Sequence, residues 1–140
     1  MTPPLMTAEE LLQTNIPNKC TELVRGVLIV REPPGGRHGA VAAELCREIG
    51  NHVHAHQFGT VYAETGFTLA RNPDTVRGPE IAFVRKDRAE NPAPVGFPEF
   101  APDLVVEVLS PSWTARTSSR AFAAPSRRSS SRYAPREVPQ

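Results

Sequence analysis

The 140-residue sequence has few cysteines, no long apolar run and no export signal. Its two cysteines, Cys20 and Cys46, have no His or Cys beside them at ligand spacing, which argues against a disulfide framework and a structural zinc site. No stretch approaches the roughly 18 consecutive apolar residues of a membrane span, and the start MTPPLMTAEELLQ lacks the basic and then apolar segments of a secretory signal. We therefore expect a soluble cytoplasmic protein of one domain with no membrane partner.

Charge is unevenly divided along the chain, although the net charge is only +1. Residues 1–113 carry 10 Lys and Arg against 14 Asp and Glu, whereas residues 114–140 carry six Arg against Glu137 alone. The acidic body therefore lacks the broad basic face of a strong non-specific DNA-binding protein. This charge leaves open an enzyme that binds phosphate through metal ions.

The last part of the sequence lacks apolar periodicity. In residues 114–140, Arg, Ser, Ala and Pro supply 20 of 27 residues, and the segment has no Leu or Ile. Such a segment buries too little apolar surface to offset the entropy lost on ordering. We therefore predict a folded domain at residues 1–113 and a disordered Arg/Ser/Ala-rich tail at residues 114–140.

Two local motifs predict structure near the N-terminus. Thr7 precedes Glu10 by three residues and begins the segment TAEELLQ, which is the pattern of a capping box at a helix start. In CTELVRGVLIV, β-branched residues stand on both sides of Gly26. A tight turn between Val24 and Val27 would make this segment an antiparallel hairpin.

The rest of the chain reads as one amphipathic helix followed by strands. The helix is expected in RHGAVAAELCREIGNHVHAHQ, with its apolar face on a sheet; the face consists of Val41, Leu45, Ile49 and Val53. After it we expect a strand or hairpin in GTVYAETGFTLA, a turn in RNPDTVRG, a strand in PEIAFVR and a proline-rich loop in residues 86–102. The segment DLVVEVLS is expected to be a central strand covered on both sides. This order predicts a mixed α/β fold.

Glu107 is the chemically unusual residue of the last strand. A carboxylate in an apolar run must be paired, protonated or bound to a metal. One interpretation is that Glu107 faces outward at an edge or pairs with an arginine. The other is that Glu80, at the mouth of an adjacent strand, converges with Glu107 to hold a divalent cation through oxygen ligands.

The segments ELVRGVLIV, PPGGRHG, GPEIAFVRKDR and PDLVVEVLSPS together resemble the Uma-two family of restriction endonucleases, which are similar in fold to PD-(D/E)XK nucleases. The resemblance covers residues 7–112 and implies a mixed central sheet flanked by helices, here incomplete at the C-terminus. It implies DNA as the substrate, Mg²⁺ or Mn²⁺ as the cofactor, and Glu80 and Glu107 as metal ligands and catalytic residues. Glu22, on the early hairpin, is implied to lie near the site. A homodimer is a possible assembly.

The sequence departs from the family pattern in two ways. The first acid is usually Asp, and Glu80 is longer by one methylene, which shifts the carboxylate by about 1.5 Å. The family also uses a lysine after the SPS motif, whereas this sequence has Leu109 at the simple E-x-K position and no lysine after Lys86. We therefore expect impaired hydrolysis, or alternatively a non-catalytic nucleic-acid-binding or interaction remnant of the fold.

Five other residues have weaker claims to a role. His52 and His56 have i, i+4 spacing that would suit a transition metal, although solvated histidines near a helix end are more typical. His38 matches a position of the resembled family, or is a plain residue at the start of the helix. Gly35 and Gly36 lack the strand and GK context of a phosphate-binding loop.

The abrupt change after Ser112 suggests a reading-frame shift or a pseudogene-like remnant, which would remove the family lysine and a second covering helix. Arg116 or Arg120 would supply positive charge but not the compact ammonium group of lysine. We predict that another frame of the coding DNA, translated across codons 108–120, continues SPS with Asp, Leu and Lys at helical spacing. Resequencing that region and translating all three frames tests this, and the absence of such residues from every frame would show that the tail is genuine.

Overall fold

The computed structural model describes residues 4–110, which form two antiparallel sheets and two helices. The four-stranded sheet has the order β2-β1-β5-β4, and the three-stranded sheet has the order β3-β6-β7. The strands are β1 (Cys20–Val24), β2 (Val27–Arg31), β3 (Gly59–Ala63), β4 (Phe67–Ala70), β5 (Thr75–Arg77), β6 (Ile81–Arg85) and β7 (Leu104–Val106). Helix α1 is Ala8–Gln13 and helix α2 is Gly36–His56. The predicted α/β class is therefore confirmed.

Both N-terminal predictions are confirmed. The Thr7 hydroxyl accepts a hydrogen bond from the Glu10 amide at 3.2 Å, and the Glu10 carboxylate accepts one from the Thr7 amide at 2.8 Å. Strands β1 and β2 pair from Val24 with Val27 outward. The turn between them needs positive φ at Gly26, where a Cβ would also come within 2.8 Å of Leu5.

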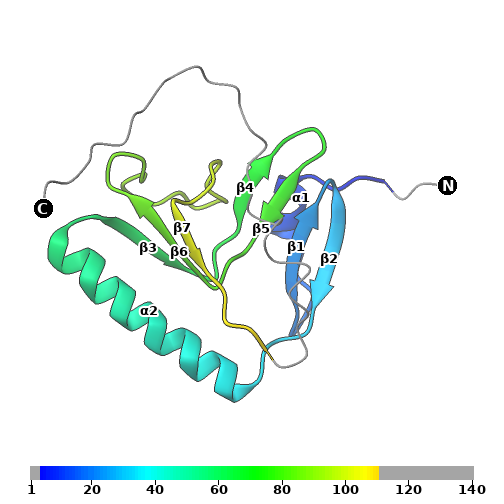
Figure 1. The fold of residues 1–140 in the computed structure, drawn as a ribbon. Coiled ribbons are helices and arrows are strands. Elements are labelled where there is room, and N and C mark those ends of the chain that lie inside the picture. Colours follow the sequence, from blue (N-terminus) through cyan, green and yellow to red (C-terminus); the bar gives the residue numbers. More distant parts are fainter. Residues whose placement is uncertain (1–3, 111–140) are drawn as a thin grey trace, which may run out of the picture.

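Helix α2 forms as predicted and runs beneath the three-stranded sheet (Figure 1), but only its C-terminal part packs as predicted. Val53 is buried, whereas Val41 and Leu45 are exposed among the described residues, so their expected packing on the sheet is wrong there. The reason is length, because a 21-residue helix extends about 30 Å and the five-residue strand β3 about 17 Å. The N-terminal half of α2 therefore extends past the three-stranded sheet.

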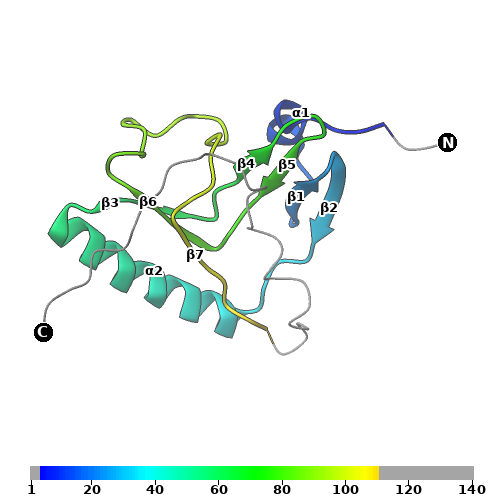
Figure 2. The same ribbon diagram turned by 45° about the horizontal axis from the view of Figure 1, so that its top comes forward.

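The segment expected to be one strand or hairpin is divided between the two sheets. Strand β3 pairs with β6 and strand β4 pairs with β5, and the chain bends between them at Glu64, where φ is 49°. A Cβ at Gly66 would lie 2.7 Å from the Phe97 ring, so the bend closes tightly on the loop of residues 86–102. Figure 2 shows the resulting separation of the β1–β2 hairpin from β3 and β6.

Two predictions, one of a turn and one of a central strand, are wrong in the described residues. The expected turn RNPDTVRG contains β5, whose Val76 pairs with Leu23 of β1 and with Thr68 of β4. The expected central strand DLVVEVLS forms only the three-residue strand β7, which lies at the edge of its sheet within residues 4–110. Strand pairing ends at Val106, opposite the first residue of β6, and beyond it the Val108 amide donates to the Glu80 carboxylate. The predicted loop and the strand in PEIAFVR are confirmed.

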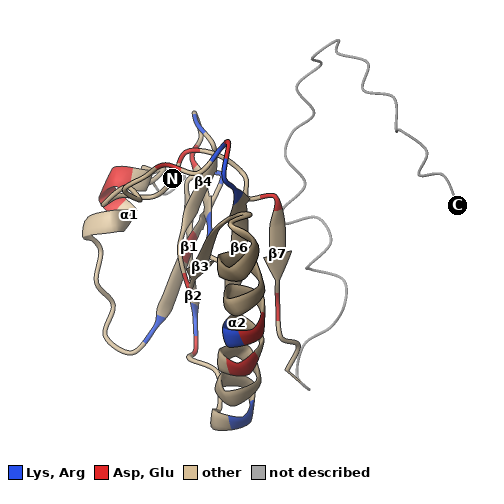
Figure 3. Ribbon diagram, turned by 90° about the vertical axis from the view of Figure 1, so that its left-hand side faces the viewer, with Lys and Arg blue, Asp and Glu red and all other residues tan. Residues whose placement is uncertain are grey.

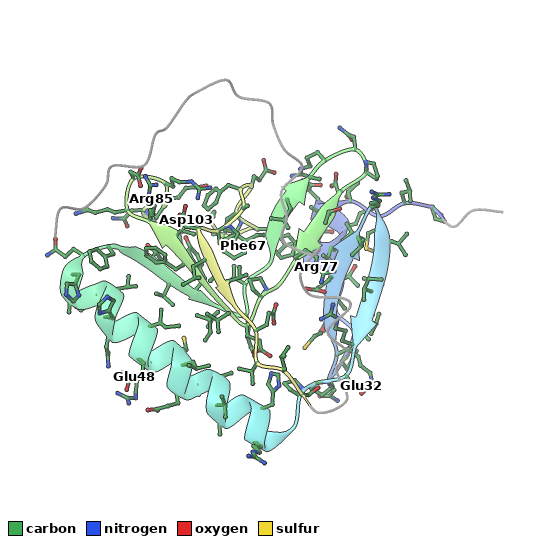
Figure 4. All side chains as sticks on the ribbon, in the orientation of Figure 1. Glu32, Glu48, Phe67, Arg77, Arg85 and Asp103 are labelled. Carbon is green, nitrogen blue, oxygen red and sulfur yellow. The ribbon has the colours of Figure 1, made fainter. Side chains whose placement is uncertain are left out.

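Phe67 joins the two sheets (Figure 4). It begins β4, is fully buried, and packs with Tyr62, Ala82 and Val84 of the three-stranded sheet. Its ring lies edge-on to Tyr62 at 5.5 Å between centroids. A second apolar cluster holds α1 on the four-stranded sheet and includes Leu11 and Leu23. The junction at Phe67 therefore sets how the two sheets sit around the site.

We expect Phe67→Ala to lower the free energy of unfolding by about 3–5 kcal/mol, because it leaves a cavity between the sheets. Urea unfolding followed by circular dichroism measures this loss. The same truncation at Phe58, which is 49% exposed, should cost less than about 1 kcal/mol. Equal losses in the two variants would show that Phe67 is not the junction.

Candidate functional site

A cleft of about 1360 Å³ separates the N-terminal half of α2 from the β1–β2 hairpin. Its wall on the hairpin side includes Glu22 and Arg31, and its wall on the helix side includes His38 and Arg47. Glu80 also lines it, at the point where the chain enters β6. The two predicted acids Glu22 and Glu80 therefore face one cavity from different sheets.

The Glu80 carboxylate connects three parts of the fold. Its Oε1 contacts Nε2 of His38, near the start of α2, and its Oε2 accepts a hydrogen bond from the Val108 amide at 2.6 Å. Strands β6 and β7 pair with Ile81 opposite Val106, so Glu80 and Glu107 extend from neighbouring strand ends. Glu80 thus stands at the mouth of a strand adjacent to the one that Glu107 follows, as expected, whereas their convergence on a metal ion stays a prediction. Nδ1 of His38 is buried and has no hydrogen-bond partner within residues 4–110.

Glu22 is held by positive charge. Its side chain is only 8% exposed, and its Oε2 lies 2.9 Å from Arg31 Nη2 and 3.5 Å from Arg77 Nη2. Its Oε1 accepts a hydrogen bond from the Gly78 amide at 2.9 Å. A buried carboxylate requires such partners, because burial removes its hydration. Glu22 is thus occupied as the anchor of two arginines and of the chain segment that leads to Glu80.

The pKa of Glu107 is raised above its ordinary value. The side chain is exposed at the surface, yet surrounding protein removes part of its hydration, and this desolvation is the largest cause of the shift. The negative charges of Glu80 and then Glu22 raise the pKa further, whereas Arg31 and Arg77 partly offset them. Glu107 is therefore exposed beyond an edge strand and also interacts electrostatically with two other acids, and its role as a metal ligand stays a prediction.

The three acids suit a hard divalent cation by their chemistry, because each supplies carboxylate oxygens and their mutual repulsion favours a bound positive charge. Within residues 4–110, however, no group of three His, Cys, Asp or Glu side chains is close enough to hold a metal ion. A two-carboxylate site completed by water and substrate phosphate remains compatible with this arrangement.

The weaker candidates lie away from the acids or have structural partners. His52 and His56 stack near Phe58 at the far end of α2, and His56 Nδ1 bonds the His52 carbonyl at 2.8 Å. Gly35 caps α2 without a side-chain hydrogen bond. Leu109 is 62% exposed, and both cysteines are free thiols. Arg116, Arg120 and the predicted tail lie outside the described residues.

Sequence reasoning missed Arg31 and Arg77 as partners of Glu22. The signal for Arg31 was available, because the predicted hairpin register sets Cys20 opposite Arg31. Glu22 lies two residues from Cys20 on the same face of β1, so Arg31 is its diagonal neighbour. Arg77 had no such signal, because it reaches Glu22 from β5, a strand that the sequence pattern did not reveal.

Comparisons with known proteins agree with this fold. A sequence model of the family Uma2, described as "Putative restriction endonuclease", matches residues 8–134. A crystal structure described as a putative nuclease belonging to DUF820 from Anabaena variabilis has a TM-score of 0.63 and 24% identity, over 79% of this chain and 62% of that chain. This chain thus spans less than two thirds of that protein, and at this identity the likeness establishes the fold alone. No curated protein matches the chain.

We expect Glu107→Gln to raise the melting temperature at neutral pH. The pKa of Glu107 is raised in the folded protein, whereas in the unfolded chain a Glu has its ordinary pKa of about 4.3. As the pH rises, the unfolded chain therefore releases this proton first, and the folded state loses stability from about pH 4.3 up to the raised pKa. Glutamine removes this loss. Below about pH 4 the carboxyl is protonated in both states, and the two proteins should melt alike.

Thermal denaturation across this pH range makes the measurement. Glu44→Gln is the opposite-sign control, because Arg47 lowers the pKa of Glu44, and its removal should leave the protein equally or slightly less stable at neutral pH. A wild-type protein that melts at a higher temperature than Glu107→Gln at neutral pH would contradict the raised pKa of Glu107.

Proposed function

This chain belongs to the Uma2 family of restriction endonuclease-like proteins, and we propose that it is a divalent-metal-dependent nuclease that hydrolyses phosphodiester bonds in DNA. Glu80 and Glu107 would hold Mg²⁺ or Mn²⁺, and Glu22 would support them from the neighbouring sheet. A homodimer and a cytoplasmic location stay predictions. Within residues 4–110 no helix is long and apolar enough to cross a bilayer.

The observation that carries the proposal is the hydrogen bond of 2.6 Å from the Val108 amide to Glu80. It ties Glu80 to the residue directly after Glu107, so two acids from separate strands share one end of a sheet. The raised pKa of Glu107 supports the same arrangement. Desolvation and the charges of Glu80 and Glu22 raise it, and perturbed pKa values of this kind are frequent at functional sites.

A bound divalent cation would supply a hydroxide-forming water and neutralise phosphate charge. The chain's own residues provide the rest of the proposed site. The His38 ring fixes one oxygen of Glu80, and the Val108 amide fixes the other, so the carboxylate is oriented before substrate arrives. The cleft between α2 and the hairpin would admit the DNA backbone.

We expect catalysis to be weak because no lysine lines the cleft within the described residues. A second candidate function, a non-catalytic nucleic-acid-binding or interaction module, is favoured by that same observation and by the exposed Leu109 at the E-x-K position. The acidic and basic residues are interspersed over the described part of the chain (Figure 3) rather than gathered on one basic face. Metal binding therefore discriminates between the two candidates better than DNA binding does.

We expect the protein to nick supercoiled plasmid DNA in Mg²⁺ or Mn²⁺ but not in a chelator. Glu80→Gln and Glu107→Gln should each lower the rate at least about 100-fold, because either removes a proposed metal ligand. Glu48→Gln is the matched control, since Glu48 pairs with Arg47 on α2.

The assignment fails if all three variants nick as fast as the wild type. If the wild type is inactive, calorimetric titration with Mn²⁺ decides between the candidates. Binding that both Glu80→Gln and Glu107→Gln abolish supports a metal site, and an absence of binding by the wild type supports the non-catalytic module.

A further inference from the structure

The proposed site needs a positively charged side chain beside its acids, and this sequence has no lysine after the SPS motif to supply one. Substrate phosphate carries negative charge, and so do Glu22 and Glu80, which line the cleft, and Glu107, which interacts electrostatically with both. A positively charged donor beside the acids stabilises the charge that develops on the phosphate. Among the described residues, the Lys and Arg side chains that line the cleft are Arg31 and Arg47.

Arg47 is already committed on the surface of α2. Its guanidinium bonds Glu44 at 2.6 and 3.1 Å and Glu48 at 2.8 Å. Two carboxylates therefore balance its single charge, and both lie on the same helix. Arg47 has no surplus positive charge to offer a substrate.

Arg31 is in the opposite situation. It shares the Glu22 carboxylate with Arg77, so this one carboxylate faces two guanidinium groups. The Arg77 side chain is 14% exposed, and the Arg31 side chain is 47% exposed. Arg31 is therefore the more exposed arginine of the pair, and it lines the cleft.

The anchoring of Arg31 also orients it. One terminal nitrogen is held at 2.9 Å by Glu22, which is itself fixed by the Gly78 amide. A guanidinium has five N–H donors in a rigid fork, so this single contact leaves donors for another oxygen pair. Arg31 and Glu80 line the same cleft, so Arg31 can contact a phosphate bound at the acid pair.

We propose that Arg31 binds the substrate phosphate at the acid pair and supplies the positive charge for which the family uses a lysine. Glu22 is then a positioning residue for Arg31 rather than a ligand of a metal ion. This assignment rests on the proposed nuclease function and deepens it, because it names the group that recognises the phosphate. Arg31 forms and breaks no covalent bond, and acts through charge-assisted hydrogen bonds to phosphate oxygens.

The test measures binding of a fluorescein-labelled DNA duplex by anisotropy in Ca²⁺, with electrophoresis to confirm that the DNA stays intact. We expect Arg31→Ala to weaken binding roughly 10- to 100-fold. It should also reduce the slope of log affinity against log salt by about 1 unit, because one phosphate contact is lost. Arg47→Ala, which also removes a cleft-lining arginine, should keep the wild-type slope.

Arg31→Lys provides the second variant, because it keeps the charge and loses the fork. It should keep the salt slope and, in Mg²⁺, nick DNA more slowly than the wild type. Circular dichroism melting confirms that each variant is folded. Normal wild-type binding with identical slopes for Arg31→Ala and Arg47→Ala overturns the role of Arg31 alone. Wild-type protein that does not bind DNA in Ca²⁺ removes both the proposed function and this role.

Discussion

The buried carboxylate of Glu22 is the constraint on which the site depends. A charge with so little exposure has to be compensated, and in this fold the compensation comes from Arg31, Arg77 and the Gly78 amide. These partners belong to β2, to β5 and to the segment that crosses into the second sheet. One side chain therefore fixes the hairpin, the added strand and the approach to Glu80.

The second carboxylate, Glu80, connects elements around the other sheet in the same way. Its contacts with His38 and with the Val108 amide bring the start of α2 and the end of β7 to the same place. Glu107 lies near this pair of contacts, and its pKa is raised first by desolvation and then by the negative charges of Glu80 and Glu22.

The fold was predictable where neighbours along the chain decide it. The capping box at Thr7 and the turn at Gly26 depend on residues within a few positions, and both form as expected. The bend at Glu64 does not follow from alternation, because it depends on Phe97 packing against Gly66 from a distant loop. The exposure of Val41 likewise depends on where the three-stranded sheet ends, which no pattern in α2 records.

The sequence by itself singled out Glu80 and Glu107, because they stand out chemically from the apolar segments that carry them, and their role as metal ligands stays a prediction. It also determined the family, which the match over residues 8–134 confirms. Only the tertiary structure decided what Glu22 does, because its partner Arg77 is 55 residues away and the intervening β5 was not recognised. Local hydrogen bonds and periodicity depend on residues close together in the sequence. The partners of a buried charge instead depend on which strands the fold brings beside it.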